Sequence, residues 1–148
     1  MAKISSLHES DFLLWTEETV NKLKALDFQH LDLPNLIEEV EALGISQKKE
    51  LLSRLTTLLE HLLKRLYVTM PQEYNGWERT IREQRKEIDL LLVQMPSLRR
   101  FWDEDMQIAW KSAIKVVRKE YRQTAFPEQW QYSIQPEAIL DYDFWEEN

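Results

Sequence analysis

Four side chains in this sequence are of types that could do acid–base chemistry or hold a metal ion: Glu41, His61, Glu83 and Asp105. Carboxylates and imidazoles that face one another across helices bind divalent ions in helical bundles. A two-metal bundle, however, repeats a Glu-x-x-His pair, and this sequence contains none. Helical periodicity also points the carboxylates in different directions, whereas a metal site needs several ligands at one point. We therefore expect no bound metal and no cofactor.

An amide at the centre of an apolar stripe is the second feature with chemical potential. At about 100° per residue, Gln84 falls in the middle of one helical face. The apolar members of that face are Trp77, Ile81, Ile88, Leu92 and Met95. A polar group buried there costs free energy unless it is hydrogen-bonded. Gln84 is therefore predicted to have a polar partner inside the core.

Glu41 and Asp105 occupy comparable positions in or beside the apolar stripes of two other predicted helices. Together with Gln84 they are predicted to form a polar cluster in the core, and this cluster would fix the register between the packed helices. The nearest cations for Asp105 are Arg79, Arg82 and Arg85. A binding or catalytic pocket built on the same cluster is the alternative. A solvated Glu41 and a flanking, hydrogen-bonded His61 are the simpler interpretations of those two residues.

Other catalytic classes find little support. The chain has no cysteine, so disulfides, thiolate metal sites and cysteine nucleophiles are excluded. Its serines fall mostly at predicted helix caps, and there is no glycine-rich phosphate loop. We expect a non-catalytic interaction or regulatory module. The alternative is a small metal-dependent or acid–base enzyme that uses Glu41, His61, Glu83 and Asp105.

The elements that would position these residues are predicted to be helices. Only 2 glycines and long segments of 3.6-residue periodicity indicate an all-α fold. We expect one domain over residues 1–148, consisting of an arm (1–9), a compact bundle of about four main helices (10–122) and a partly irregular tail (123–148). The expected helices span 10–26, 33–68, 76–95 and 97–122. Ser10, Asn75 and Ser97 are their predicted caps, and Asp32 caps the second.

The second helix raises a question of length. Its apolar phase continues across Gly44 almost unbroken, yet a straight helix over 33–68 would be about 54 Å long at 1.5 Å per residue. A globule of this chain length measures only about 30 Å across twice its radius of gyration. Gly44 followed by Ser46 offers a stop and a fresh cap. A break or kink near Gly44 is therefore predicted.

Charge is distributed unevenly along the chain. The net charge is -7, residues 77–122 are net basic, and the tail after Arg122 holds six acidic residues and no lysine or arginine. The aromatic tail is predicted to dock over the basic region, with a basic partner surface as the alternative. Overall acidity disfavours nucleic-acid binding. The expected partner is another protein or a second copy of the chain.

No apolar run approaches the length of a membrane span, and the first residues lack the apolar core of a signal peptide. A cytoplasmic location is the resulting expectation.

Several motifs occur together in one order: Asp11-Phe12, Leu36-Ile37-Glu38-Glu39-Val40-Glu41-Ala42-Leu43-Gly44, His61-Leu62-Leu63-Lys64, Trp77 through Arg85, Pro96-Ser97-Leu98-Arg99 and Asp141-Tyr142-Asp143-Phe144. They resemble the bacterial domain-of-unknown-function family number twenty-nine over nearly the whole chain. The resemblance implies a compact helical fold. It brings no established activity, substrate or catalytic residue. Arg65 departs from the family pattern, in which a tryptophan is expected, so the packing at that point is open.

Overall fold

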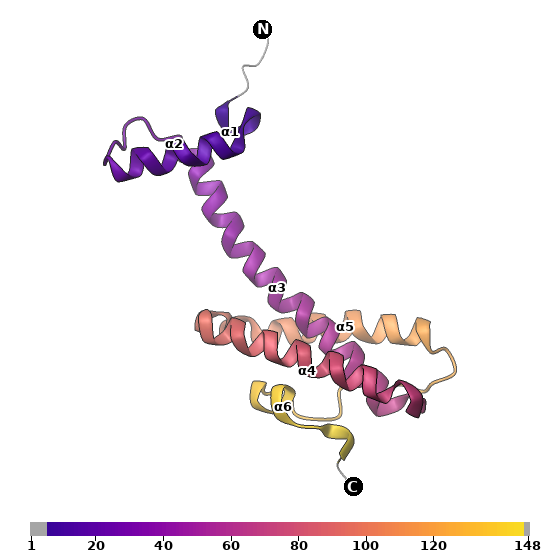
Figure 1. Cartoon of the computed structure of the whole chain (residues 1–148). Helices are drawn as coiled ribbons and strands as arrows, with labels where there is room; N and C mark the ends of the chain where they lie inside the picture. Colours follow the sequence, from indigo (N-terminus) through magenta and orange to yellow (C-terminus); the bar gives the residue numbers. More distant parts are fainter. Residues whose placement is uncertain (1–5, 147–148) are drawn as a thin grey trace. The chain divides into compact units, whose positions relative to one another are not determined.

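Helices dominate the computed structural model, which describes residues 6–146 (Figure 1). Four of them exceed ten residues: α2 (Phe12–Lys24), α3 (Leu33–Tyr67), α4 (Pro71–Gln94) and α5 (Trp102–Glu120). The shorter ones are α1 (Leu7–Ser10), α6 (Pro136–Asp141) and the 3₁₀ helices η1 (Pro96–Phe101) and η2 (Phe144–Glu146). No strand occurs among the described residues. The predicted all-α fold with four main helices is confirmed.

Backbone contacts divide the chain into two compact units, one that ends at Ser46 and one that begins at Gln47. We call them the N-terminal unit and the C-terminal unit. Sequence reasoning did not anticipate this division, because it grouped residues 10–122 into one bundle. The expected N-terminal arm also differs, since Leu7–Ser10 forms the short helix α1. The first five residues of that arm lie outside the described part of the chain.

The predicted break near Gly44 is wrong, because α3 runs without interruption from Leu33 to Tyr67. Gly44 has no positive φ angle, and a Cβ added there would meet no atom within 4 Å. The argument from length assumed that the whole helix lies within one globule. Its residues in fact divide between two units, so the diameter of a single globule sets no limit on it.

The N-terminal unit contains α1, α2 and the first turns of α3. The Asp11 carboxylate accepts a hydrogen bond from the Leu14 amide at 3.1 Å, so α2 begins after Asp11 and not after the predicted cap Ser10. Trp15 and Thr19 are the buried residues of α2. The Trp15 indole donates to the Asp32 carboxylate at 3.3 Å, which ties α2 to the start of α3. The unit therefore has a very small core.

The C-terminal unit holds the main hydrophobic core. Leucines of α3 at Leu51, Leu55, Leu58, Leu59, Leu62 and Leu63 are almost completely buried. They pack in one cluster with Trp77, Ile81 and Ile88 of α4 and with Trp102, Ala109, Ala113 and Val117 of α5. Pro71 occupies the first turn of α4, where its missing N–H costs nothing. The predicted start of this helix at residue 76 and its cap at Asn75 are therefore wrong, and η1 precedes α5 where a cap at Ser97 was expected.

Within the C-terminal unit, the tail formed by residues 123–146 packs against the helices. Phe126, Ala138, Ile139 and Phe144 are buried in its core cluster, and α6 contacts α4 (Figure 1). Three ion pairs join this tail to the basic region: Arg85–Asp143 at 2.9 Å, Arg118–Glu128 at 3.6 Å and Arg99–Glu137 at 3.8 Å. The last two are exposed and contribute little to stability.

Arg65, which departs from the family pattern, lies among aromatic rings. Its guanidinium carbon is 3.8 Å from the centre of the Tyr74 ring and 5.2 Å from that of Trp145. Its Nε is buried without a hydrogen-bond partner, and the Glu78 carboxylate lies 3.6 Å from it. A planar guanidinium stacks on aromatic faces. Arg65 thus fills an aromatic position with a flat cation, and it links α3, α4 and the tail.

Candidate functional site

The four residues singled out for chemistry lie in separate surroundings. Glu41 is exposed on α3 in the N-terminal unit, and Glu83 is exposed on α4 in the C-terminal unit. The predicted place of Glu41 in a buried polar cluster is wrong, because every buried residue of α3 lies at Leu51 or beyond. The apolar stripe on which Glu41 falls is itself exposed in the N-terminal unit. Among the described residues, no three His, Asp or Glu side chains are grouped as metal ligands would be.

His61 is half-buried on α3, as a flanking residue of its leucine stripe. Its Nδ1–H donates to the Thr57 carbonyl oxygen at 2.8 Å, within the same helix. Burial lowers the pKa of His61, and the bond to Thr57 and the nearby Glu120 charge oppose that shift. The ring is therefore neutral at pH 7 and satisfies a backbone carbonyl.

Asp105 is buried on α5, and one of its carboxylate oxygens, Oδ2, has no hydrogen-bond partner. Burial raises the pKa of Asp105, and the adjacent Glu104 charge raises it further. The expected pairing with arginines of α4 is absent, because Arg85 binds the tail while Arg79 and Arg82 are exposed. Asp105 is thus a carboxylate held in an unfavourable place, with no neighbouring group that would make it an acid–base pair.

Gln84 is half-buried and accepts a hydrogen bond from Arg54 Nη1 of α3 at 3.3 Å. It therefore has the polar partner that its place in the stripe required, but that partner is a helix-surface arginine. Arg54 also bonds the Glu50 carboxylate at 3.1 Å. The three members of the predicted cluster have unrelated surroundings: Glu41 is exposed, Gln84 bonds Arg54, and Asp105 Oδ2 is unpaired.

Arg85, not Gln84, is the buried polar residue of the α4 stripe. Its Nε donates to the Ile139 carbonyl and its Nη1 to the Asp143 carboxylate, both at 2.9 Å, and Nη2 donates to the Tyr142 carbonyl. Sequence reasoning missed this role. The available signal was its spacing of four from Ile81 and three to Ile88, which places it on the core line, together with a tail of acids that lacks any cation.

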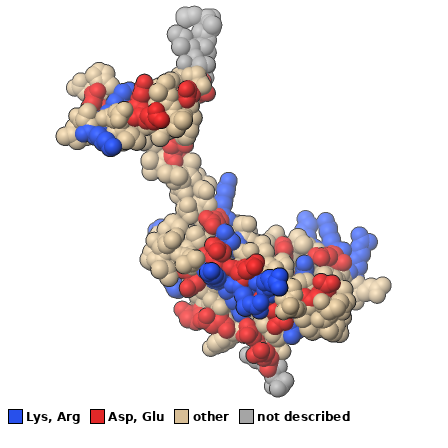
Figure 2. Space-filling model, in the orientation of Figure 1, with Lys and Arg blue, Asp and Glu red and all other residues tan. Residues whose placement is uncertain are grey.

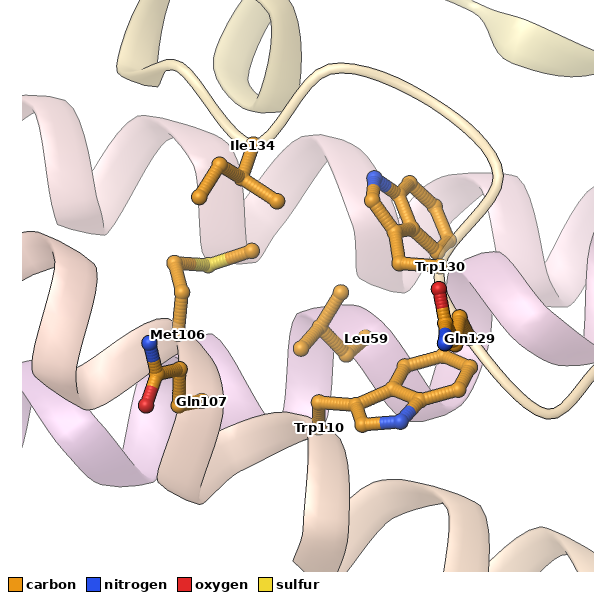
Figure 3. Close-up of a pocket in the computed structure, with 7 residues that line it drawn as sticks. All are labelled: Leu59, Met106, Gln107, Trp110, Gln129, Trp130 and Ile134. Carbon is orange, nitrogen blue, oxygen red and sulfur yellow. The ribbon is translucent and has the colours of Figure 1, made fainter.

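A small apolar cavity of about 190 Å³ lies in the C-terminal unit (Figure 3). It is lined by Leu59, Met106, Gln107, Trp110, Gln129, Trp130 and Ile134. The two indole rings meet edge to face, with their centres 6.3 Å apart. None of the seven lining residues is ionisable. The cavity can therefore hold an apolar group but has no side chain that could transfer a proton.

A second apolar hollow, the N-terminal groove, runs between α2 and α3 and measures about 280 Å³. Its α2 wall is Phe12, Trp15, Thr16, Thr19, Val20 and Leu23, and its α3 wall is Leu36, Glu39, Val40 and Leu43. The lining residues of each wall repeat at helical spacing, so each wall is one face of a helix. Glu39 is the one ionisable residue that lines it, and the His8 ring nitrogen lies 2.7 Å from its carboxylate.

Large apolar side chains are exposed around this groove. Twelve of the eighteen large hydrophobic residues exposed in the described chain lie between Phe12 and Ile45. They are Phe12, Leu13, Leu14, Val20, Leu23, Leu26, Phe28, Leu33, Ile37, Val40, Leu43 and Ile45. Single exposed apolar residues are ordinary, and five of these twelve, namely Phe12, Val20, Leu23, Val40 and Leu43, line the groove together. The N-terminal unit therefore exposes most of the large apolar side chains that are exposed in the described chain.

The comparisons with known proteins place the chain in a family. The family model described as "Domain of unknown function DUF29" matches residues 7–145. The chain belongs to the DUF29 family. This confirms the family to which the sequence motifs pointed, and the match covers both units of the DUF29 chain. No curated protein and no solved structure matches it. No helix in the described part of this DUF29 protein is both long and apolar enough to cross a membrane.

Proposed function

We propose that this DUF29 protein is a non-catalytic interaction module and that its N-terminal unit binds another protein. The exposed apolar surface of α2 and the first turns of α3 is the observation that carries the proposal. Burying one large apolar side chain contributes about 1.5–3 kcal/mol. Association costs about 4–15 kcal/mol in lost freedom, so a partner that covered many of these residues would offset that cost.

The conformation of Leu26 supports the same surface. Leu26 has a φ angle of 59° at the end of α2 and is 71% exposed. The Asp27 amide donates to the Lys22 carbonyl at 2.9 Å and the Leu26 amide to the Leu23 carbonyl at 3.1 Å, which is a Schellman cap. Glycine or asparagine suits this position, and leucine costs about 1–2 kcal/mol there. A large apolar residue kept in a strained, solvent-facing position is explained by a contact with a partner.

The small core of the N-terminal unit gives a third line of support. Trp15 and Thr19 are its buried residues in α2, while the groove beside them is open. A unit with so little buried apolar area gains stability from a partner that fills the groove. The C-terminal unit, with its large core, then serves as the stable platform for this surface.

The test compares two substitutions of matched chemistry. Val40 and Val93 are exposed helical valines, at 59% and 68%, in the N-terminal and C-terminal units respectively. Proteins that copurify with the tagged full chain would be identified for the wild type, Val40→Asp and Val93→Asp. The strongest candidate would then be purified and titrated against all three. We expect Val40→Asp to weaken its binding at least about tenfold, which is 1.4 kcal/mol, and Val93→Asp to leave it unchanged. Equal binding by all three proteins would overturn the proposal.

A further inference from the structure

The chemistry of the N-terminal groove identifies the class of partner that fits it. We infer that the groove binds a basic amphipathic helix of another protein, about three turns long. This inference rests on the proposed interaction function and names the partner of that same site. It is carried by the shape of the groove, by the net negative charge of residues 6–46 and by the small number of cations paired with that charge among the described residues.

The shape favours a helix. Both walls are helical, and the α2 wall extends from Phe12 to Leu23. At 1.5 Å per residue this is about 16 Å, or three helical turns. A helix laid between two helices inserts its apolar residues at three- and four-residue spacing into such a groove. A peptide that binds by strand addition would need the free edge of a sheet, and the described residues contain no strand.

The charge favours a basic occupant. Residues 6–46 hold nine acidic side chains and only two basic ones, Lys22 and Lys24. Both lysines lie in the last turn of α2. Acidic residues appear on the surface of this unit in Figure 2. Exposed carboxylates on the two helices that form the groove are Glu17 and Glu18 on α2 and Glu38 and Glu41 on α3, so they contribute to the net negative charge of the unit. Complementary charge at the rim of an interface selects partners and speeds association.

These carboxylates are also unpaired, in contrast to those of the C-terminal unit. Within the described residues, no ion pair involves Glu17, Glu18, Glu38 or Glu41, and the N-terminal unit pairs its acids only with histidines, His8–Glu39 and His30–Asp27. In the C-terminal unit, seven acidic residues pair with arginine or lysine: Glu50, Glu78, Glu87, Glu120, Glu128, Glu137 and Asp143. Lysines or arginines of a partner would supply the missing cations.

The same charge argues against other occupants. Two copies of this unit would bring together two segments that each hold nine acidic residues and two lysines over residues 6–46, and like charges in an interface are unfavourable. Nucleic acids and anionic lipid surfaces are attracted by basic patches, which this unit lacks. A basic, apolar-striped helix is the partner that complements both the apolar groove and the net negative charge of the unit.

Binding of three labelled 14-residue peptides to the full chain, followed by fluorescence anisotropy, tests the inference. The first places leucines on one helical stripe and lysines elsewhere, the second replaces every lysine by glutamate, and the third shuffles the first so that its stripe is lost. We expect the first to bind at least about tenfold more tightly than the others, and more weakly as salt rises. The double substitution Glu38→Lys and Glu41→Lys should weaken binding by a similar factor. Glu83→Lys with Asp89→Lys, two exposed acids of α4, changes the net charge equally and should have little effect.

Each other outcome is informative. If the lysine and glutamate peptides bind equally and Val40→Asp abolishes both, the interaction function stands and the basic partner is wrong. If the shuffled peptide binds as well as the striped one, attraction is only electrostatic and the helical occupant is wrong. If the chain instead self-associates in sedimentation, and Val40→Asp but not Val93→Asp prevents this, a second copy fills the groove and the inference falls. Binding to anionic vesicles that depends on Val40 would overturn it as well.

Discussion

Asp105 is a buried carboxylate in a helical core, and its ionised form costs free energy there. Its Oδ2 is buried without a hydrogen bond, and burial raises its pKa above the ordinary value of 3.8. The position near the N-terminus of α5 offsets part of that cost, because the helix dipole favours negative charge there. The remaining cost is present whenever the carboxylate is ionised in the folded state, and therefore at pH 7.

We expect Asp105→Asn to raise the free energy of unfolding at pH 7 by about 1 kcal/mol or less. The advantage should shrink as the pH falls through the raised pKa toward 3.8, where wild-type Asp105 becomes protonated in both the folded and unfolded states. Asp103→Asn, in the same turn but exposed, is the control and should give no gain. Urea unfolding between pH 4 and pH 7 measures both. Equal behaviour of the two variants would show that Asp105 ionises without penalty.

Arg85 is the residue that attaches the tail. Arg85→Met keeps the apolar stem but leaves the Ile139 and Tyr142 carbonyls without their donor. Stranded buried groups cost about 1–3 kcal/mol each, so we expect a loss of about 2–4 kcal/mol and faster proteolysis near residues 126–135. Arg82→Met, at an exposed position of the same helix, should change stability by less than about 0.5 kcal/mol. A similar small change for Arg85→Met would mean that packing alone holds the tail.

Periodicity located the α4 face from Trp77 to Leu92 but chose the wrong polar residue on it. Gln84 and Arg85 differ by 100° around the helix, and both fall within the width of an apolar stripe. The choice between them depended on a contact 54 residues away, with the Ile139 carbonyl, which spacing within one helix cannot reveal. The expected cluster of Glu41, Gln84 and Asp105 failed for the same reason: it required knowing which helices face one another.

At the scale of elements, helix existence was predictable and helix ends were not. All four long helices lie where the 3.6-residue pattern placed them. The observed first residues of two helices differ from the predicted ones, because each segment contains more than one residue that can begin a helix. Asp11 caps α2 where Ser10 was predicted, and α4 begins at Pro71, before Asn75. The pattern records burial, whereas the end of a helix depends on which side chain or carbonyl satisfies its terminal amides.

Gly44 offers a direct test of the continuity of α3. In an exposed helical position with open space around its Cα, Gly44→Ala should stabilise the local helix by about 0.5–1 kcal/mol. Amide hydrogen exchange around residues 40–48 should slow by about two- to fivefold. Gly76→Ala in α4, also in open space, is the matched control and should slow exchange in its own helix. No change at Gly44 together with a gain at Gly76 would indicate that α3 is not helical there in solution.

At the scale of the whole molecule, the division into two units could not be read from the apolar pattern. The stripe of α3 keeps its phase from Leu33 to Leu63, although its residues are exposed before Ser46 and buried from Leu51 onward. The spacing of apolar residues along a helix is the same whether their side chains are buried in a core or exposed on a surface. Charge was the feature that differed, since residues 6–46 carry nine acids and two bases while the C-terminal unit is close to neutral.

The division predicts that the C-terminal unit folds without the N-terminal one. Every residue of the main core cluster lies at Leu51 or later, so a fragment of residues 46–148 retains that core, and Ser46 can cap its shortened helix. We expect cooperative unfolding with a midpoint within about 5 °C of the main transition of the full chain, which corresponds to a change of about 1 kcal/mol. A fragment of residues 46–125 lacks the buried Phe126, Ile139 and Phe144 and should lose several kcal/mol. Non-cooperative unfolding of the 46–148 fragment, or a loss as large as that of 46–125, would show that the N-terminal unit is part of the folding core and that its apolar surface is structural.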